Sequence, residues 1–393
     1  MEAGVRAFEQ GQRRPLASPA HHQPRRLLQR GARAPAQDEE ESWAGRQIGA
    51  KLRVKIALDT AGGDDEFTSN IDGAVQAANA WGMKVVLVGP AERVRSELTA
   101  RGVAPDDTRF EVVDAPELIG MDEDPAVACR AKPRASILVA AELVAQGHAD
   151  GLVSAGHPGA TMVAALWHLK RIPGVLRPAI AVPVPTARGV TLVLDGGANM
   201  DCKPWHLVQF ALMGTIIFRH LHGRQNATVG LLTIDKEEGK GNDLVRETFP
   251  RLKSAGLEFC GAVEGRDVPA GKTDVVVCDG FVGSVVVKTM EGAALAVMGM
   301  LKSEILATWR RRLAGILLKG PFTRLKRKMS CEEYGGALLV GVNGIVVSCH
   351  GSSNARAIAH AVRAAARTAE SGLVAAMKEA VARADACDET VPA

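Results

Sequence analysis

Short runs of β-branched and other apolar residues alternate with amphipathic stretches from Val54 onward, and this alternation limits the fold more than any other feature. Strands separated by helices in this way form a parallel or mostly parallel sheet, which helices cover on both faces. We therefore expect an α/β fold. The expected strands are 54–58, 84–88, 110–113, 151–153, 190–194, 228–234, 257–259 and 274–278, and the expected helices lie near 70–82, 90–101, 134–147, 158–171, 204–222, 241–255 and 284–307.

Residues 1–52 have a different composition, because Arg, Ala, Gln and Pro dominate and no apolar periodicity survives. We expect a disordered leader there and one folded domain over 53–390. The leader has the Arg- and Ala-rich composition of an organelle transit peptide, and an incidental upstream extension explains it equally well. No secretory apolar core is present, and the longest apolar stretch noted, 204–218, is too short to span a membrane.

The overall composition argues against several classes of protein. The net charge is only +4 and aromatic residues make up 4%, so we expect no nucleic-acid partner. Seven scattered Cys with no C-x-x-C pair indicate neither a disulfide framework nor a zinc ribbon. We expect a reducing compartment.

Glycine-rich loops with polar residues follow several of the expected strands. In open α/β sheets ligands bind where strands end, so we expect four of these loops to converge on one site. No G-x-G-x-x-G and no P-loop motif is present, so the sheet alone does not indicate a nucleotide. The four loops are 59–64, 154–159, 195–199 and 278–281.

Two glycine segments precede expected helices and so resemble anion sites. Residues 196–199 lead to Lys203, and 239–242 end at Asn242. Backbone N–H groups and the helix dipole bind anions at such places. The alternative is that the glycines only make tight turns, with Asn242 as a helix N-cap.

Nucleophilic catalysis by a side chain is poorly supported. Ser154 misses the G-x-S-x-G pattern by one residue. Cys202 lies beside Lys203, whose charge could activate it, but a packed thiol explains it as well. His157 and His350 suit phosphate binding or proton transfer, or simple structural hydrogen bonds.

A basic amphipathic segment occupies about 298–330. Cations surround an apolar stripe with a spacing of four, and Pro321 is expected to break the helix. This pattern fits an anionic membrane surface or an acidic partner; the alternative is a core-facing helix with a solvated basic face. The stripe is Leu301, Ile305, Trp309, Leu313 and Leu317, and the cations are Arg310, Arg311, Arg312, Lys319, Arg324, Lys326, Arg327 and Lys328.

Taken together, the loops make the chain from about Val54 to Ala365 resemble the bacterial phosphate acyltransferase family of phospholipid synthesis, the PlsX family. Several long matches occur in the family's order along the chain. The matching stretches are 171–174, 177–179, 195–204, 240–242, 264–267, 274–283, 334–337 and 350–353.

The resemblance implies transfer of a fatty acyl group from acyl carrier protein to inorganic phosphate, giving acyl phosphate, with no metal and no organic cofactor. It implies a three-layer α/β/α sandwich with a mostly parallel Rossmann-like sheet, assembled as a homodimer. It also implies a cytoplasmic protein attached peripherally to the membrane, where the acyl-phosphate-dependent glycerol-3-phosphate acyltransferase is a further partner.

The family pattern also suggests site residues. Lys203 is expected to neutralise phosphate, and Asn242 to orient it or to donate to the developing oxyanion. The resemblance places substrate-binding residues around these two, namely Asn199, Asp201, Lys240 and Ser154, with His350 and Asp279 as secondary candidates.

Three loops depart from the family's usual sequence. Residues 61–67 lose a His and gain Asp65 and Glu66, 157–159 read His-Pro-Gly where Asn-Thr-Gly is usual, and 132–136 keep one of two serines. Acidic residues near phosphate would be unfavourable. Two alternatives therefore stay open: a related phosphate acetyltransferase or decarboxylating dehydrogenase, and a non-catalytic membrane scaffold of the same fold.

Overall fold

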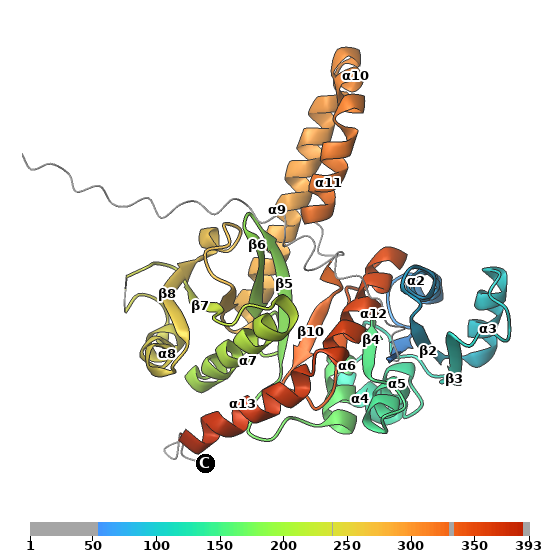
Figure 1. Cartoon of the computed structure of the whole chain (residues 1–393), viewed down its shortest axis with the longest axis horizontal. Helices are drawn as coiled ribbons and strands as arrows, with labels where there is room; N and C mark the ends of the chain where they lie inside the picture. The colour runs from blue at the N-terminus through green and yellow to red at the C-terminus, as the bar shows by residue number, and fades with distance from the viewer. Residues whose placement is uncertain (1–53, 238, 330–333, 388–393) are drawn as a thin grey trace, which may run out of the picture.

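Eleven strands form one sheet in the order β3-β2-β1-β4-β11-β10-β5-β6-β9-β7-β8 (Figure 1). The structure is a computed structural model that describes residues 54–237, 239–329 and 334–387. The expected disordered leader lies outside the described residues. Seven strand pairings are parallel and three are antiparallel, so the predicted α/β class with a mostly parallel sheet is confirmed.

The N-terminal half of the sheet is parallel and has helices on both faces. Buried residues of α2, α3 and α12 pack on one face, and those of α4, α5 and α6 on the other. The strands are β1 (Lys55–Asp59), β2 (Lys84–Gly89), β3 (Phe110–Asp114), β4 (Gly151–Ser154) and β11 (Val346–Ser348); the helices are α2 (Glu66–Trp81), α3 (Ala91–Ala100), α4 (Pro125–Ala131), α5 (Ser136–Ala145), α6 (Pro158–Ala164), its π-helical continuation η1 (Ala165–Leu169) and α12 (Ala355–Glu370).

The other half repeats this three-layer arrangement. Helices α7, α8 and α13 pack on one face, while the first turns of α9 cover the other. The strands are β6 (Gly189–Leu194), β7 (Thr228–Thr233), β8 (Glu258–Glu264) and β9 (Val275–Val277); the helices are α7 (Pro204–His222), α8 (Asp243–Ser254), the 3-10 turn η2 (Gly265–Asp267), α9 (Gly280–Leu306) and α13 (Leu373–Cys387).

Two strands that were not expected join the halves. β10 (Ala337–Val340) is antiparallel to both β11 and β5 (Ala179–Thr186), and β5 is antiparallel to β6. The two parallel halves therefore run in opposite directions within the sheet.

β5 was not predicted because it contains Pro183 and Pro185, which have no N–H to donate to a neighbouring strand. In the structure, β10 pairs only with residues 179–181 of β5, so both prolines lie where that side of the strand is unpaired. β10 and β11 are only four and three residues long, which is too short for a period to stand out. Helices α4, α12 and α13 were likewise not expected.

The basic amphipathic segment forms a helical hairpin that projects from the body (Figure 1). α9 carries Leu301 and Ile305 and ends at Leu306, and α10 (Trp309–Leu317) and α11 (Lys319–Met329) follow. The predicted apolar stripe is therefore split between two helices at Ala307 and Thr308. α10 ends at Leu317 and α11 begins at Lys319 with Pro321 in its first turn, so the predicted break occurs just before this proline.

α9 is long and apolar over most of its length, which the apolar stretches noted in the sequence did not indicate. Its most apolar 18-residue window has a mean hydropathy of 1.5 and is only 11% buried, so by length and composition the helix could cross a membrane. Its first turns, however, pack in the core through Gly283 and Val287. α9 is thus anchored to the sheet at one end and exposes apolar side chains at the other.

The end of α7 contains a histidine that makes stability depend on pH. Burial, together with the nearby charges of Arg224 and Arg367, lowers the pKa of His222 to about 4, and its ring stacks on Phe218 at 4.4 Å between centroids. A folded-state pKa below the unfolded value of about 6.5 means that the unfolded chain binds the extra proton first. Stability from this group is complete above pH 6.5 and is lost as the pH falls toward 4.

We predict that His222→Gln removes roughly 2–3 kcal/mol of the acid-dependent loss of stability between pH 6.5 and 4. Urea unfolding of both proteins at several pH values measures this difference. Parallel curves of stability against pH for the two proteins would contradict the prediction.

Candidate functional site

The buried carboxylate of Asp195 organises the loop that follows β6. Its Oδ1 accepts backbone N–H groups from Ile180 at 2.9 Å, Gly197 at 3.1 Å and Ala198 at 3.0 Å. Its Oδ2 accepts the N–H of Asn199 at 2.6 Å and the side-chain amide of the same residue at 2.8 Å. Five donors therefore hold this carboxylate and give the loop a defined shape.

The same loop contacts the start of α9. The Asn199 carbonyl accepts the N–H of Gly280 at 2.8 Å, and a Cβ at Gly283 would fall on the carbonyl oxygen of Asp195. Asp279 caps α9 by accepting the N–H of Val282 at 2.9 Å. The side-chain NH₂ group of Asn199 also donates to the Pro178 carbonyl, so only the side-chain oxygen Oδ1 is left to face a ligand.

Lys203 immediately precedes α7 and is exposed. Its backbone N–H donates to His206 Nδ1 at 3.1 Å, and its ammonium lies 5.2 Å from the ring centroid of Trp205. No carboxylate of the described residues pairs with this ammonium. Since a helix N-terminus favours anions, an unpaired cation beside it is suited to bind an anion together with the helix.

The loop before α8 contains two further predicted site residues, Lys240 and Asn242. Asn242 is the N-cap, and its Oδ1 accepts the N–H of Val245 at 3.0 Å, so the structural interpretation of this residue is confirmed. Its NH₂ group donates to none of the described residues and remains able to bind a ligand. The ammonium of Lys240 lies 3.6 Å from a carboxylate oxygen of Glu237.

These loops begin at one edge of the sheet. β6, β9 and β7 are adjacent and parallel, and Lys203, Asp279 and Asn242 follow them in that order. Neighbouring strands are about 4.8 Å apart, so the three strand ends lie within roughly 10 Å. The exposed residue Asp201 belongs to the loop that contains Lys203.

A second group of loops surrounds the buried carboxyl of Asp59 at the end of β1. Asp59 accepts the hydroxyls of Ser136 at 2.7 Å and Ser154 at 2.8 Å. Burial raises the pKa of this carboxyl, and the hydroxyl and backbone hydrogen bonds oppose the rise. The Ser154 Oγ also accepts the N–H of Gly156 at 3.0 Å, so its hydrogen-bonding capacity is largely used within the protein.

The two loop histidines have local partners. His157 replaces the Asn usual in this position, yet it caps α6, because its Nδ1 accepts the N–H of Gly159 at 3.0 Å and of Ala160 at 3.3 Å. The exposed His350 has its Nδ1 2.8 Å from the Ser352 hydroxyl. Both therefore have the structural hydrogen bonds that the sequence analysis left open.

The four predicted loops thus form two groups. Hydrogen bonds join the 195–203 and 278–283 loops, and others join 59–64 to the loops after β4 and β11. Strands of the two halves run in opposite directions, so the rule that ligands bind where parallel strands end does not by itself bring the two groups together. That all four loops share one site stays a prediction.

Cys202 is not an activated nucleophile. Burial, with the carboxylates of Asp195 and Asp279 nearby, raises the pKa of its thiol to about 12. The packed-thiol interpretation is therefore the one the structure supports. Among the described residues, no cluster of His, Cys, Asp and Glu is arranged to hold a metal ion.

Sequence reasoning missed the organising role of Asp59 and Asp195. Both carboxylates are buried and lie where a strand ends. A Gly-Gly pair follows each of them, at 62–63 after Asp59 and at 196–197 after Asp195. That repeated Asp and Gly-Gly arrangement was the available signal, since glycine lets backbone N–H groups turn toward a carboxylate.

Comparison with known proteins identifies the relatives of this chain. The family described as fatty acid synthesis protein matches residues 54–376. Phosphate acyltransferase from Elusimicrobium minutum is 48% identical over 329 residues, covering 84% of this chain and 96% of the relative, and the protein of that name from Desulforamulus reducens is 46% identical over 338 residues, covering 84% and 97%. The fold also matches a phosphotransacetylase from Streptococcus pyogenes, with a TM-score of 0.55, 19% identity and coverage of 85% and 97%.

The close contact between Gly283 and Asp195 can be tested by substitution. We predict that Gly283→Ala destabilises the protein by about 2–4 kcal/mol, because the new methyl group displaces the loop before α7. In contrast, Gly292→Ala, in the same helix with open space around it, should stabilise by about 0.5–1 kcal/mol. Denaturant unfolding measures both, and equal effects would contradict the packing described.

Proposed function

This chain belongs to the fatty acid synthesis protein family and is an acyltransferase acting on phosphate, and we propose that its acyl donor is a fatty acid carried by acyl carrier protein. The reaction gives acyl phosphate and the free carrier thiol. Among the observations, the Lys203 ammonium at the N-terminus of α7, which pairs with no carboxylate of the described residues, supports this proposal most strongly.

The reaction needs binding groups more than a protein nucleophile. A phosphate oxygen attacks the thioester carbonyl carbon, a new C–O bond forms, and the C–S bond breaks with its electrons on sulfur, which then takes a proton. The protein must hold the phosphate dianion close to the thioester and stabilise the oxyanion that develops on the carbonyl. A Ser154 engaged with Asp59 and a Cys202 thiol with a pKa of about 12 agree with a reaction in which phosphate is the nucleophile.

In this proposal Lys203 and the first turn of α7 bind phosphate. The NH₂ group of Asn242 orients the phosphate or donates to the oxyanion, while the Oδ1 of the same residue keeps α8 capped. Lys240 and Asp201 border the site. Asn199 and Asp279 contribute by holding the loop and the start of α9 in place.

A role in phospholipid synthesis follows from the product in the same proposal. Acyl phosphate has a fatty chain and a charged head, so an enzyme that consumes it works best at a membrane. We propose that the protein is a cytoplasmic homodimer attached to the membrane surface, where a membrane acyl-phosphate-dependent glycerol-3-phosphate acyltransferase accepts the product. Exposed apolar side chains on α10, Trp309, Leu313 and Ile316, support attachment through the hairpin.

The arginines of α10 suit an anionic surface. Arg310 lies over the ring of Trp309 at 5.4 Å, Arg311 pairs with Glu304 at 2.7 Å, and Arg312 donates to the Leu306 carbonyl at 2.8 Å. Three cations beside an exposed aromatic ring form the kind of surface that binds lipid headgroups. Docking of the acidic acyl carrier protein on the same segment is the competing use.

We predict that Lys203→Ala lowers phosphate-dependent release of carrier thiol from acyl carrier thioester by about 100-fold or more, because the phosphate loses its cation. Lys84→Ala, at an exposed position far along the sheet, should leave the rate unchanged. Absence of release from the unmodified protein would support the non-catalytic scaffold, and release that is independent of phosphate would indicate thioester hydrolysis instead of acyl transfer to phosphate. Preference for acetyl-CoA would identify a phosphate acetyltransferase.

The membrane proposal predicts that replacing Arg310, Arg311 and Arg312 with Glu reduces binding to anionic liposomes by at least tenfold. Co-sedimentation with vesicles measures binding, and turnover with soluble substrates should be largely retained. The matched control changes Arg246, Arg251 and Lys253 of α8 to Glu, removing the same charge elsewhere. Equal loss in both variants, or no loss in the first, would remove the membrane role from the hairpin.

A further inference from the structure

A polar cavity of about 370 Å³ lies at the amino-terminal ends of β6, β7 and β9. The turn between β5 and β6, the connection from α7 to β7, and residues 271–274 line it. Asp195, Asp279 and Asn242 follow the opposite ends of the same strands. β7 has six residues, so roughly 20 Å of strand separates the cavity from the loops assigned to acyl transfer.

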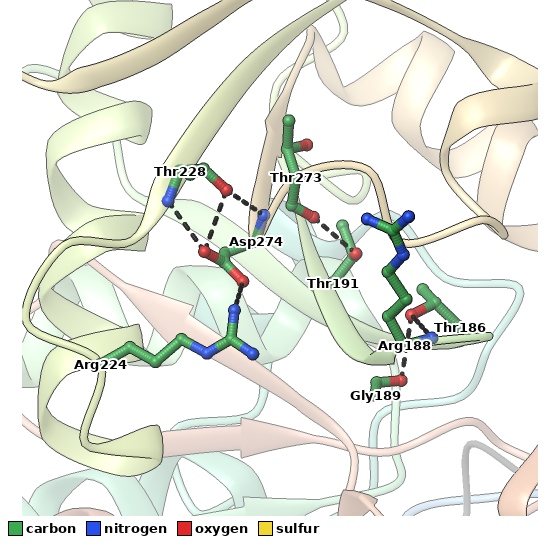
Figure 2. Close-up of polar contacts among 8 residues, drawn as sticks. All are labelled: Thr186, Arg188, Gly189, Thr191, Arg224, Thr228, Thr273 and Asp274. Carbon is green, nitrogen blue, oxygen red and sulfur yellow. Dashed lines mark hydrogen bonds and ion pairs between the residues drawn. The ribbon is translucent and has the colours of Figure 1, made fainter. Parts of the chain in front are cut away.

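Three cationic side chains line this cavity, Arg188, Arg224 and Lys272, against one carboxylate, Asp274. The carboxylate is already satisfied, because it accepts the N–H and the hydroxyl of Thr228, each at 2.9 Å, and pairs with Arg224 (Figure 2). Positive charge therefore exceeds negative charge on the lining. Anions are the ligands that such a lining favours.

Arg188 is the cation with unused donors. Its backbone N–H donates to the Thr186 hydroxyl at 3.3 Å, but its guanidinium forms no hydrogen bond or ion pair with any residue the structure describes. Figure 2 shows this side chain extended from the turn between β5 and β6. Lys272 has one distant partner, the Asp267 carboxylate at 3.4 Å.

Thr273 also belongs to the lining, but its hydroxyl is not open to the cavity. Thr273 is 4% exposed and lines the cavity, and its Oγ1 has no hydrogen-bond partner among the described residues. Its carbonyl, in contrast, accepts the Thr191 hydroxyl at 2.8 Å (Figure 2). This hydroxyl is enclosed by the protein, so a ligand in the cavity meets the cations of the lining and not this oxygen.

We propose that this cavity binds a small hydrophilic phosphate ester, with its phosphate on Arg188 and Lys272. Arginine and lysine are the side chains that recognise phosphate. The volume exceeds that of an inorganic ion and reaches the lower range of small-molecule sites, so room remains for a hydroxylated body beside Thr186 and Asn226. Because the cavity lies away from the acyl-transfer loops, the ligand is an effector and not a substrate.

Isothermal titration calorimetry tests the site with two probes, glycerol 3-phosphate and glucose 6-phosphate, and with glycerol and glucose as uncharged controls. The full chain carrying Lys203→Ala is used, so that the phosphate site of the proposed reaction does not contribute. We expect saturable binding of a phosphate probe, weakened roughly tenfold or more by Arg188→Gln. Arg251→Gln, which removes an exposed cation of α8, should leave the affinity unchanged. The absence of saturable binding, or equal affinity in the Arg188→Gln variant, would overturn the proposal.

Lys272→Gln tests the second cation of the lining and should weaken probe binding several-fold. Unchanged binding in this variant would show that Lys272 does not contact the phosphate and would count against the site. Binding needs no turnover, so its outcome is separate from that of the acyl-transfer assay.

Discussion

The carboxylate of Asp195 is the group on which the arrangement of the α7 and α9 N-termini depends. The carboxylate is fully buried, and five N–H donors surround it. These hydrogen bonds replace the hydration that a charged group loses on burial. Through Asn199 the same loop meets Gly280, the first residue of α9. One buried negative charge therefore aligns two helix N-termini whose own partial charges favour anions.

Apolar periodicity predicted the parts of the fold that are local in the chain. Strands such as β2 and β7 and helices such as α7 have a continuous apolar pattern, and they appear within a few residues of the expected bounds. The joining strands could not be found in this way. Pro183 and Pro185 indicate the end of a strand. They fit in β5 because β10 pairs only with residues 179–181 and needs no N–H donor from the positions of the two prolines.

The motifs of the site could be predicted from the sequence, but not which of their residues contact a ligand and which only hold the loops in place. The family pattern identified Lys203, Asn199 and Asn242 together, and sequence has no means to separate a ligand contact from a structural one. In the structure the Asn199 amide is used by Asp195 and Pro178, while Lys203 has no carboxylate partner in the described part of the chain. The difference arises from hydrogen bonds between residues of separate loops, which no spacing reveals.

The placement of β10 and β11 has a consequence for the order in which the chain can fold. Both strands come from residues 337–348, yet they complete the sheet between β4 and β5, which are made far earlier. Until that segment leaves the ribosome, the nascent chain has two uncovered strand edges and no α12 to bury the adjacent apolar face. Exposed edges and faces of this kind favour association with other chains, so the sheet is most exposed to aggregation before residues 337–370 are made.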